Sequence, residues 1–314
     1  MNHDFDGLTE HPLRETKMPK VIRAATAGFC MGVDLALKKL ERQLSEGADQ
    51  ARAIYTLGPI IHNPQVLADY AERGVSQLED PEKAPSGCSV VIRAHGVPRH
   101  VRRTLRRHGV RLVDATCPKV KKAQKLIESH TQDRNLLLYG EPDHPEVVGL
   151  VSYAQSETMV FQDISELSGR LAEGRAYVLA AQTTQDRSEY TRIHEILSAR
   201  LSGDLPVLDT ICDTTRQRQQ EAWDITEQVD LMIVVGGRSS GNTRRLAQVA
   251  ASQGKPCVHV EEASELPLER IRACDAVGLT AGASTPGRVI DEVEEVVAGL
   301  EDASSNTDGE DHGE

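Results

Sequence analysis

The chain has 314 residues, of which 39% are hydrophobic and 27% are charged, and its formal net charge is −12. This composition is typical of a globular protein with two or three domains, and no apolar run is long enough to cross a bilayer. The first twenty residues are polar and do not resemble a signal peptide, so we expect no membrane association. We therefore predict a cytoplasmic location, where six cysteines favour metal binding or catalysis over disulfides.

The two ends of the chain differ in composition from its middle. Residues 1–19 are polar, and residues 301–314 carry six acidic side chains with no Lys or Arg, which predicts two disordered ends. Between them, short runs of Val, Ile and Leu alternate with segments of helical periodicity, which predicts an α/β fold. We expect three similar α/β domains, with small mostly parallel sheets arranged pseudo-threefold around a central cavity. Their predicted boundaries are 20–115, 116–208 and 209–300.

One cysteine follows the first predicted strand of each repeated unit. These are Cys30, Cys117 and Cys212, after apolar runs at 21–25, 110–113 and 206–208. Three widely spaced thiolates fit a [4Fe–4S] cluster with an open fourth iron better than structural zinc, which prefers four ligands. Such an iron is a Lewis acid that can bind a hydroxyl group. Helix N-termini directly after Cys117 and Cys212 should favour the thiolate form.

The three remaining cysteines are expected to be structural. They lie inside predicted strands or at the opposite rim of the sheets, where a buried thiol packs as a small apolar side chain. These residues are Cys88, Cys257 and Cys274.

The second and third predicted strands of each unit also end in polar residues at matching positions. A Gly is followed four residues later by His62, His144 or Ser240, and the third strands lead into His95, Thr183 and Ser284. Because ligands bind at the carboxyl ends of parallel strands, these side chains should line one cavity. The alternative is that α/β proteins place polar residues in such turns without any shared function.

Two segments indicate what the cavity binds. Residues 236–243 form a Gly/Ser loop before a helix, where backbone amides bind phosphate, although the loop matches no Walker pattern. The donors suited to a compact anion such as diphosphate are His62, His95, Ser240, Asn242 and Ser284. Glu146 follows His144 closely, and as a buried acid it could protonate a departing hydroxyl. The alternative for Glu146 is that it only begins the next helix, where acidic residues are favoured.

A run of arginines forms the most basic part of the chain. We place Arg99, Arg102, Arg103, Arg106, Arg107 and Arg111 on one helix, with Val101 and Leu105 facing inward. This surface is either a solvated helix face or a docking patch for an acidic partner protein. Nucleic acid binding is not expected, because the run lacks interleaved aromatic residues and the whole chain is acidic.

Seven motifs resemble, in order, those of the 4-hydroxy-3-methylbut-2-enyl diphosphate reductase (IspH/LytB) family. They are TAGFCMGV, GPIIHNP, RAHGVP, DATCP, HPEV, QTT and TAGASTP, and the resemblance runs from about Val21 to Leu300. It implies three α/β domains around a central cavity and a [4Fe–4S] cluster on Cys30, Cys117 and Cys212. It also implies reductive dehydroxylation of (E)-4-hydroxy-3-methylbut-2-enyl diphosphate to isopentenyl and dimethylallyl diphosphate. This is the last step of the methylerythritol phosphate route to isoprenoids.

The resemblance further implies a role for each cavity residue. Substrate would be held by His62, His95, His144, Thr183, Ser240, Gly241, Asn242 and Ser284. Glu146 would relay protons, assisted by His144 and Thr183. Two electrons would come from an external carrier of the ferredoxin or flavodoxin type.

Two positions depart from the family pattern. Gly241 stands where a second Ser is common, and Asp143 stands before His144 where Gly is usual. We expect activity to survive both changes. Two other classes remain open, a non-redox [4Fe–4S] hydro-lyase acting on a small phosphorylated substrate and a non-enzymatic iron–sulfur sensor. The hydro-lyase needs no electron donor, and the sensor needs no Glu146.

Overall fold

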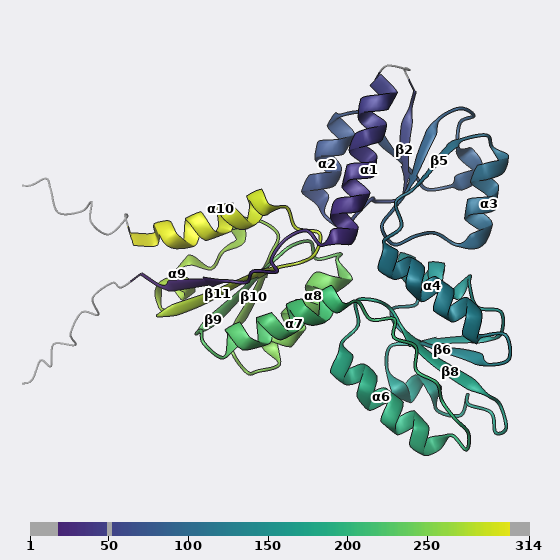
Figure 1. Cartoon of the computed structure of the whole chain (residues 1–314). Helices are drawn as coiled ribbons and strands as arrows, with labels where there is room; N and C mark the ends of the chain where they lie inside the picture. Colours follow the sequence, from purple (N-terminus) through teal and green to yellow (C-terminus); the bar gives the residue numbers. More distant parts are fainter. Residues whose placement is uncertain (1–17, 49–51, 302–314) are drawn as a thin grey trace, which may run out of the picture.

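The strands form three separate parallel sheets, each in its own lobe (Figure 1). The computed structural model describes residues 18–48 and 52–301, so the disorder predicted for residues 1–17 and 302–314 lies outside the described part of the chain. Each sheet is covered by helices on both faces, and the lobes meet at a common centre. The predicted α/β fold with three small parallel sheets is confirmed.

The first lobe contains a four-stranded sheet in the order β3-β2-β4-β5. Its strands are β2 (Ile54–Leu57), β3 (Val75–Leu78), β4 (Ser89–Ile92) and β5 (Arg111–Asp114). Its helices are α1 (Met31–Ala48), α2 (Pro64–Glu72) and α3 (Arg99–Arg107), with a 3-10 turn at Pro81–Lys83. Leu40 of α1 and Val91 belong to the core on one face, and Leu105 of α3 packs with Val90 and Ile92 on the other.

The second lobe contains a three-stranded sheet in the order β7-β6-β8. Its strands are β6 (Asn135–Tyr139), β7 (Thr158–Phe161) and β8 (Tyr177–Ala181). Its helices are α4 (Pro118–His130), α5 (Pro145–Val151) and α6 (Arg187–Arg200), with a 3-10 turn at Ile164–Leu167. Helices α4 and α5 cover one face and α6 the other. Val207 adds a single parallel bridge to Leu179 at the edge of this sheet.

The third lobe contains a four-stranded sheet in the order β1-β11-β9-β10. Its strands are β1 (Lys20–Arg23), β9 (Leu231–Val235), β10 (Cys257–Val260) and β11 (Ala276–Ala281). Its helices are α7 (Asp213–Thr226), α8 (Gly241–Ala251), α9 (Leu268–Arg272) and α10 (Gly287–Ala298). Short 3-10 turns lie at Ala263–Glu265 and Gly299–Glu301. Helices α7 and α8 cover one face of this sheet, and α9 and α10 cover the other.

The position of β1 differs from the prediction that residues 20–115 form one domain. Strand β1 pairs along its whole length with β11, more than 250 residues later in the chain, and runs into the third lobe (Figure 1). Arg23 anchors it there through ion pairs of 2.7 Å to Asp291 and 2.6 Å to Glu294 of α10. The alternation of strands and helices did not reveal this exchange, because a four-residue edge strand carries no pairing signal of its own.

Each candidate metal ligand therefore lies where the chain passes from one lobe to the next. Cys30 links β1 of the third sheet to α1 of the first lobe, and Cys117 links β5 of the first sheet to α4 of the second. Cys212 follows the bridge at Val207 and precedes α7 of the third lobe. Strand β5 before Cys117 completes the first sheet and Val207 before Cys212 extends the second, both within the boundaries predicted at 115 and 208. Strand β1 before Cys30 joins the third sheet instead of the first. This arrangement places all three cysteines at the junctions between the lobes.

The arginine-rich helix is shorter than predicted. Helix α3 ends at Arg107 because the chain turns at Gly109, where φ is +65°, and Arg111 begins β5. Leu105 is buried and Val101 half-buried, as predicted. No helix in residues 18–48 and 52–301 is both long and apolar enough to cross a membrane.

Candidate functional site

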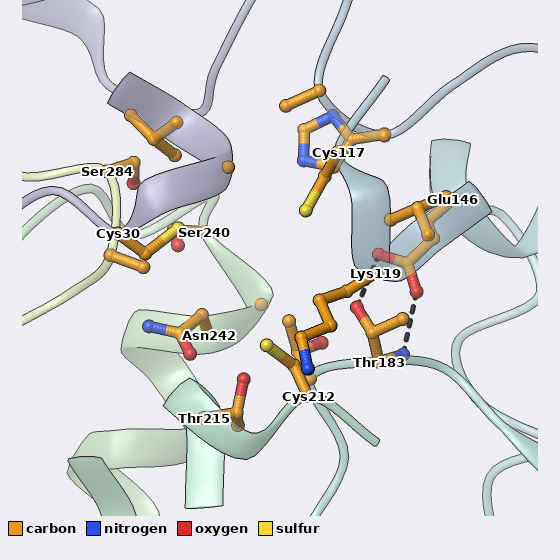
Figure 2. Close-up of a pocket in the computed structure, with 18 of the residues that line it drawn as sticks. Cys30, Cys117, Lys119, Glu146, Thr183, Cys212, Thr215, Ser240, Asn242 and Ser284 are labelled. Atoms are coloured by element: carbon orange, nitrogen blue, oxygen red, sulfur yellow. Dashed lines mark hydrogen bonds between the residues drawn. The ribbon is translucent and has the colours of Figure 1, made fainter. Parts of the chain in front are cut away.

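A cavity lined by residues of all three lobes lies at their junction. Every residue that the sequence assigned to a site contributes to its wall: Cys30, His62, His95, Cys117, His144, Glu146, Thr183, Cys212, Ser240, Gly241, Asn242 and Ser284. The sulfurs of the three cysteines enter it from three sides, with Glu146 and Thr183 on one wall (Figure 2). The structure thus brings together the whole predicted set, whose individual roles stay predictions.

The three cysteines are placed by the starts of three helices. Cys117 and Cys212 are the N-cap residues of α4 and α7, and Cys30 directly precedes α1. Gly32 allows α1 to approach the second thiol, because a Cβ on Gly32 would lie 2.5 Å from Cys117 Sγ and 3.8 Å from Cys30 Sγ. Cys88, Cys257 and Cys274 lie at the amino ends of β4, β10 and β11, away from this cavity.

The donor set of the cavity is compatible with an iron–sulfur cluster. Three thiols from three separate segments line this one cavity, and thiolate is a soft ligand that both iron–sulfur clusters and zinc accept. Structural zinc sites normally have four protein ligands, whereas a [4Fe–4S] cluster can be held by three cysteines with one iron left open.

The expected effect of helix N-termini on the thiols is only partly realised. Burial raises the pKa of Cys117, and the adjacent Cys30 and Cys212 raise it further. The backbone N–H groups of Lys119 and Val120 at the start of α4 lower this pKa, but they do not outweigh burial. At Cys117 the net shift is the reverse of our prediction.

Glu146 is a fully buried carboxyl group held by one residue from the neighbouring strand end. Its Oε1 accepts the backbone N–H of Thr183 at 2.7 Å, and its Oε2 accepts the Thr183 hydroxyl at 2.9 Å (Figure 2). Burial raises the pKa of Glu146 to about 7, although both hydrogen bonds from Thr183 favour the charged form. Glu146 also lies in the first turn of α5, so it both begins the helix and faces the cavity. A carboxyl group with this pKa can hold and release a proton near neutral pH.

Three histidines lie side by side in the cavity wall. Their ring centroids are 4.6 Å apart for His62 and His95, 5.3 Å for His95 and His144, and 5.6 Å for His62 and His144. Burial lowers the pKa of each, to about 4 for His144 and well below the usual range for His95. The rings are therefore neutral at pH 7.

The charges around the histidines favour an anion over a metal ion. Besides burial, Arg93 and Arg244 lower the pKa of both His62 and His144, while Glu141 raises that of His62. Arg244 is paired with Glu141 at 2.7 Å, so Arg93 supplies the positive charge beside this cluster that has no carboxylate partner within the described residues. Buried His62 Nε2 and His95 Nδ1 have no hydrogen-bond partner within the described residues. Buried polar atoms are normally paired, so these nitrogens are suited to a bound polar ligand.

The start of α8 completes the anion-binding part of the cavity. Ser240 caps this helix by accepting the N–H of Thr243 at 3.3 Å, which leaves its own hydroxyl proton available to a ligand. The side-chain nitrogen of Asn242 is buried, and no partner for it is found among the described residues. Ser284 donates to the carbonyl of His62 at 3.1 Å and thereby joins the first and third lobes.

The two departures from the family pattern differ in position. Asp143 is exposed and does not line the cavity, so its charge faces solvent. Gly241 lines the cavity, and a Cβ there would lie 3.5 Å from Glu141 Oε1 and 3.7 Å from His144 Nε2. These are ordinary contact distances, so the backbone has room for a Ser side chain.

Sequence reasoning missed several residues of the cavity wall. These are Gly32, Lys119, Thr214, Thr215 and Arg218, among others. Most of them lie in the first turn or two of the helix after a cysteine, where one face points toward the same space as the thiol. That periodicity was available as a signal in the sequence.

Fold and site together define a three-lobed α/β enzyme with thiols, a buried acid and anion-binding groups in one central cavity. The chain belongs to the LytB family, whose description is "LytB protein" and whose model matches residues 21–298. The predicted family is thus confirmed.

Relatives in the family carry one enzyme name, 4-hydroxy-3-methylbut-2-enyl diphosphate reductase. The protein of that name from Solidesulfovibrio magneticus is 56% identical over 282 residues, covering 88% of this chain and 99% of the relative. The one from Thermoanaerobacter sp. is 36% identical over 277 residues, covering 87% and 95%.

Two solved structures resemble the chain. One is described as (E)-4-hydroxy-3-methyl-but-2-enyl diphosphate reductase, the terminal enzyme of the non-mevalonate pathway. It has a TM-score of 0.64 and 34% identity, covering 88% of this chain and 98% of that one. The E-1-hydroxy-2-methyl-but-2-enyl-4-diphosphate reductase of Plasmodium falciparum has a TM-score of 0.83 at 24% identity, covering 89% and 88%, and supports the fold alone.

Proposed function

We propose that the chain is a 4-hydroxy-3-methylbut-2-enyl diphosphate reductase of the non-mevalonate route to isoprenoids. The enzyme names of its relatives support this assignment. The observation that carries it is a single cavity in which three thiols, a buried acid and unpaired anion-binding groups face one another. In the reaction, one substrate, two electrons and two protons give one water and either isopentenyl or dimethylallyl diphosphate.

Cys30, Cys117 and Cys212 would hold the redox cofactor, one [4Fe–4S] cluster. Their thiols come from three separate segments of the chain and line one cavity, and three cysteine ligands suit a cubane better than structural zinc, which prefers four. When bound, such a cluster supplies electrons one at a time and leaves one Lewis-acidic iron without a protein ligand. Gly32 keeps the space beside two of the thiols free of side-chain atoms.

The diphosphate of the substrate would occupy the opposite part of the cavity. The neutral rings of His62 and His95 and the amide of Asn242 offer N–H donors that lack protein partners within the described residues. Ser240, Ser284 and His144 line the same space, and the backbone amides at the start of α8 add a partial positive charge. At Gly241 the donor is the backbone amide alone.

Glu146 would supply protons to the reacting end of the substrate. Its pKa of about 7 allows the carboxyl to carry a proton at neutral pH and to release it as the hydroxyl departs as water. Thr183 donates to Glu146 from both its backbone and its side chain, so it fixes the carboxyl in one orientation. Its hydroxyl and His144 also line the cavity and would orient the hydroxyl of the substrate.

The electrons would come from an external one-electron carrier of the ferredoxin or flavodoxin type, in the cytoplasm. The arginine-rich helix is one candidate docking patch. Arg103, Arg106 and Arg107 are exposed and form no ion pair within the described chain, whereas Arg99 and Arg102 pair with Glu128 and Asp114. Helix α3 lies on the outer side of the first lobe (Figure 1), so the solvated-face interpretation of its charge also stays open.

An anaerobic assay with and without reductant tests the proposed function. Protein carrying about four irons per chain should convert (E)-4-hydroxy-3-methylbut-2-enyl diphosphate only when dithionite or a reduced carrier is present. Conversion that is independent of reductant would indicate a hydro-lyase. Tight binding of substrate without turnover under either condition would indicate a sensor. A stoichiometric zinc content in anaerobically purified protein would contradict the cluster assignment.

A further inference from the structure

Helix α7 carries a buried arginine on the thiol side of the cavity. Arg218 lies six residues after Cys212, is only 3% exposed and lines the cavity wall. Its two terminal nitrogens donate to backbone carbonyls, Nη1 to Ala281 at 3.0 Å and Nη2 to Gly28 at 2.6 Å. Arg218 therefore joins α7 to the end of β11 and to the loop that leads into Cys30.

The charge of Arg218 is not neutralised by a carboxylate. Both hydrogen-bond acceptors are uncharged carbonyls, its Nε has no partner, and no ion pair to it is found within the described residues. Glu221 lies one turn further along α7, but its carboxylate accepts the N–H groups of Ala25 and Thr26 at 2.7 and 3.0 Å. Burying a guanidinium without a carboxylate partner costs free energy, and Arg remains charged at neutral pH. Another anion close to Arg218 would offset this cost.

The thiolates of the proposed cofactor site would supply such an anion. Burial lowers the pKa of Arg218, while Cys30, Glu221 and Cys212 raise it. Gly28, which accepts from Arg218, lies two residues before Cys30, and Cys212 is the N-cap of the helix that carries Arg218. The guanidinium is thus hydrogen-bonded to the segment that leads to Cys30 and carried on the helix that follows Cys212.

We propose that Arg218 is a built-in counter-charge for the iron–sulfur cluster that makes the cluster easier to reduce. This inference rests on the proposed function, because it requires the cluster on Cys30, Cys117 and Cys212. Each electron taken from the external carrier adds one negative charge to the cluster and oxidises one carrier molecule. A fixed buried cation stabilises the more negative, reduced state more strongly than the oxidised one. Arg218 is therefore a positioning and tuning residue rather than a catalytic one.

The test is the midpoint potential of the cluster in the full-length holoprotein, measured anaerobically by dithionite titration with mediators. Three variants separate charge from geometry. R218Q removes the charge and keeps one side-chain amide donor. R218K keeps the charge but loses the paired guanidinium nitrogens that donate to Ala281 and Gly28. R216Q removes an exposed cation of the same helix, four residues after Cys212, where solvent screens the charge.

R218Q should shift the equilibrium constant for one-electron reduction about tenfold toward the oxidised form, which is about 59 mV for a one-electron couple. R218K and R216Q should stay within about threefold of wild type. An unchanged potential in iron-replete R218Q, or equal shifts in R218Q and R218K, would overturn the proposal. If R218Q loses its cluster, retention of four irons and the wild-type potential in R218K supports a counter-charge. Loss from both variants would show that only the hydrogen-bonding fork matters.

Wild-type iron content and reductant-dependent turnover, measured in the same preparations, report on the proposed function itself. A wild-type protein without a cluster would contradict the cofactor assignment, and Arg218 would then be a structural residue. A wild-type protein with its cluster and turnover, but with a potential insensitive to R218Q, would leave the function intact and reject the role of Arg218.

Discussion

Replacing Glu146 by Gln alters a single buried functional group and should change both turnover and the pH dependence of stability. Gln keeps the size of the side chain and can still meet Thr183, since its oxygen accepts the backbone N–H and its amide nitrogen donates to the hydroxyl. The variant cannot deliver a proton. We therefore expect a fold close to that of the wild type with turnover reduced by about 10²- to 10⁴-fold, the usual contribution of a positioned general acid.

The magnitude of the stability effect follows from the raised pKa. Moving the pKa of Glu146 from 4.5 to about 7 corresponds to about 3 kcal/mol of preference for the protonated form in the folded protein. This contribution to the free energy of unfolding is fully present below pH 4.5 and is lost as pH rises through about 7. Above pH 7 the wild type buries a carboxylate, whereas E146Q buries a neutral amide at every pH.

Urea denaturation of wild type and E146Q in the same cofactor state, followed by circular dichroism between pH 5 and pH 8, measures this difference. The variant should gain about 2.5 kcal/mol relative to wild type across that interval, since part of the loss already occurs below pH 5. Wild-type turnover should fall above pH 7 as Glu146 loses its proton, and the residual turnover of E146Q should not show this limb. Affinity for inorganic diphosphate should be similar in both proteins, because Gln keeps the size of the side chain and both hydrogen bonds to Thr183.

If the free energies of unfolding of wild type and E146Q change in parallel with pH, the pKa of Glu146 is not raised in the folded protein. Unchanged turnover in E146Q would refute the role of Glu146 in proton delivery, whatever the stability curves show. The variant T183V tests whether the Thr183 hydroxyl influences the pKa of Glu146, because it removes the hydroxyl that donates to Oε2 of Glu146. It should raise the pH at which turnover falls, since the charged form of Glu146 then has one hydrogen bond fewer.

Ser substitution at Cys30, Cys117 or Cys212 should abolish iron binding. The same change at Cys88, Cys257 or Cys274 should leave the iron content unchanged, and loss of iron in both groups would contradict the division into ligand and structural cysteines. G32A should lower iron content without removing a ligand, because the new methyl would lie 2.5 Å from Cys117 Sγ, whereas G287A meets no atom within 4 Å and serves as its control. G241S should tighten binding of inorganic diphosphate several-fold by adding a hydroxyl donor in available space, and weaker binding measured by calorimetry would contradict this. Reversing Arg103, Arg106 and Arg107 to Glu should slow carrier-driven turnover and spare dithionite-driven turnover if α3 docks the carrier; equal effects on both would exclude docking.

The sequence predicted the composition of the site better than the connections between the lobes. Polar residues that follow buried strands at repeated positions must gather at the carboxyl edges of parallel sheets, so His62, His144 and Ser240 could be placed in one cavity without coordinates. The lobe to which β1 belongs could not be predicted. Its four residues carry no pairing preference, and its partner β11 is specified only once the third lobe has folded.

The electrostatic balance of the site was equally inaccessible from sequence. The helix start at Cys117 predicted a favoured thiolate, but the burial that outweighs it depends on how closely the lobes meet. The same is true of Arg218, whose spacing from Cys212 is readable but whose two backbone partners come from distant segments. Charge within a cavity depends on packing between segments, and short-range periodicity does not report it.

The pairing of β1 with β11 also sets the order in which the protein can mature. Ribosomes deliver the chain from its N-terminus, yet residues 20–23 have no sheet to join until residues 276–281 have been made. The loop that leads to Cys30 is held by Gly28 and Ala25 contacts to α7, which is itself synthesised late. The first thiol therefore reaches its final position only after β11 has been translated, so the proposed cluster would assemble on all three cysteines only after that point.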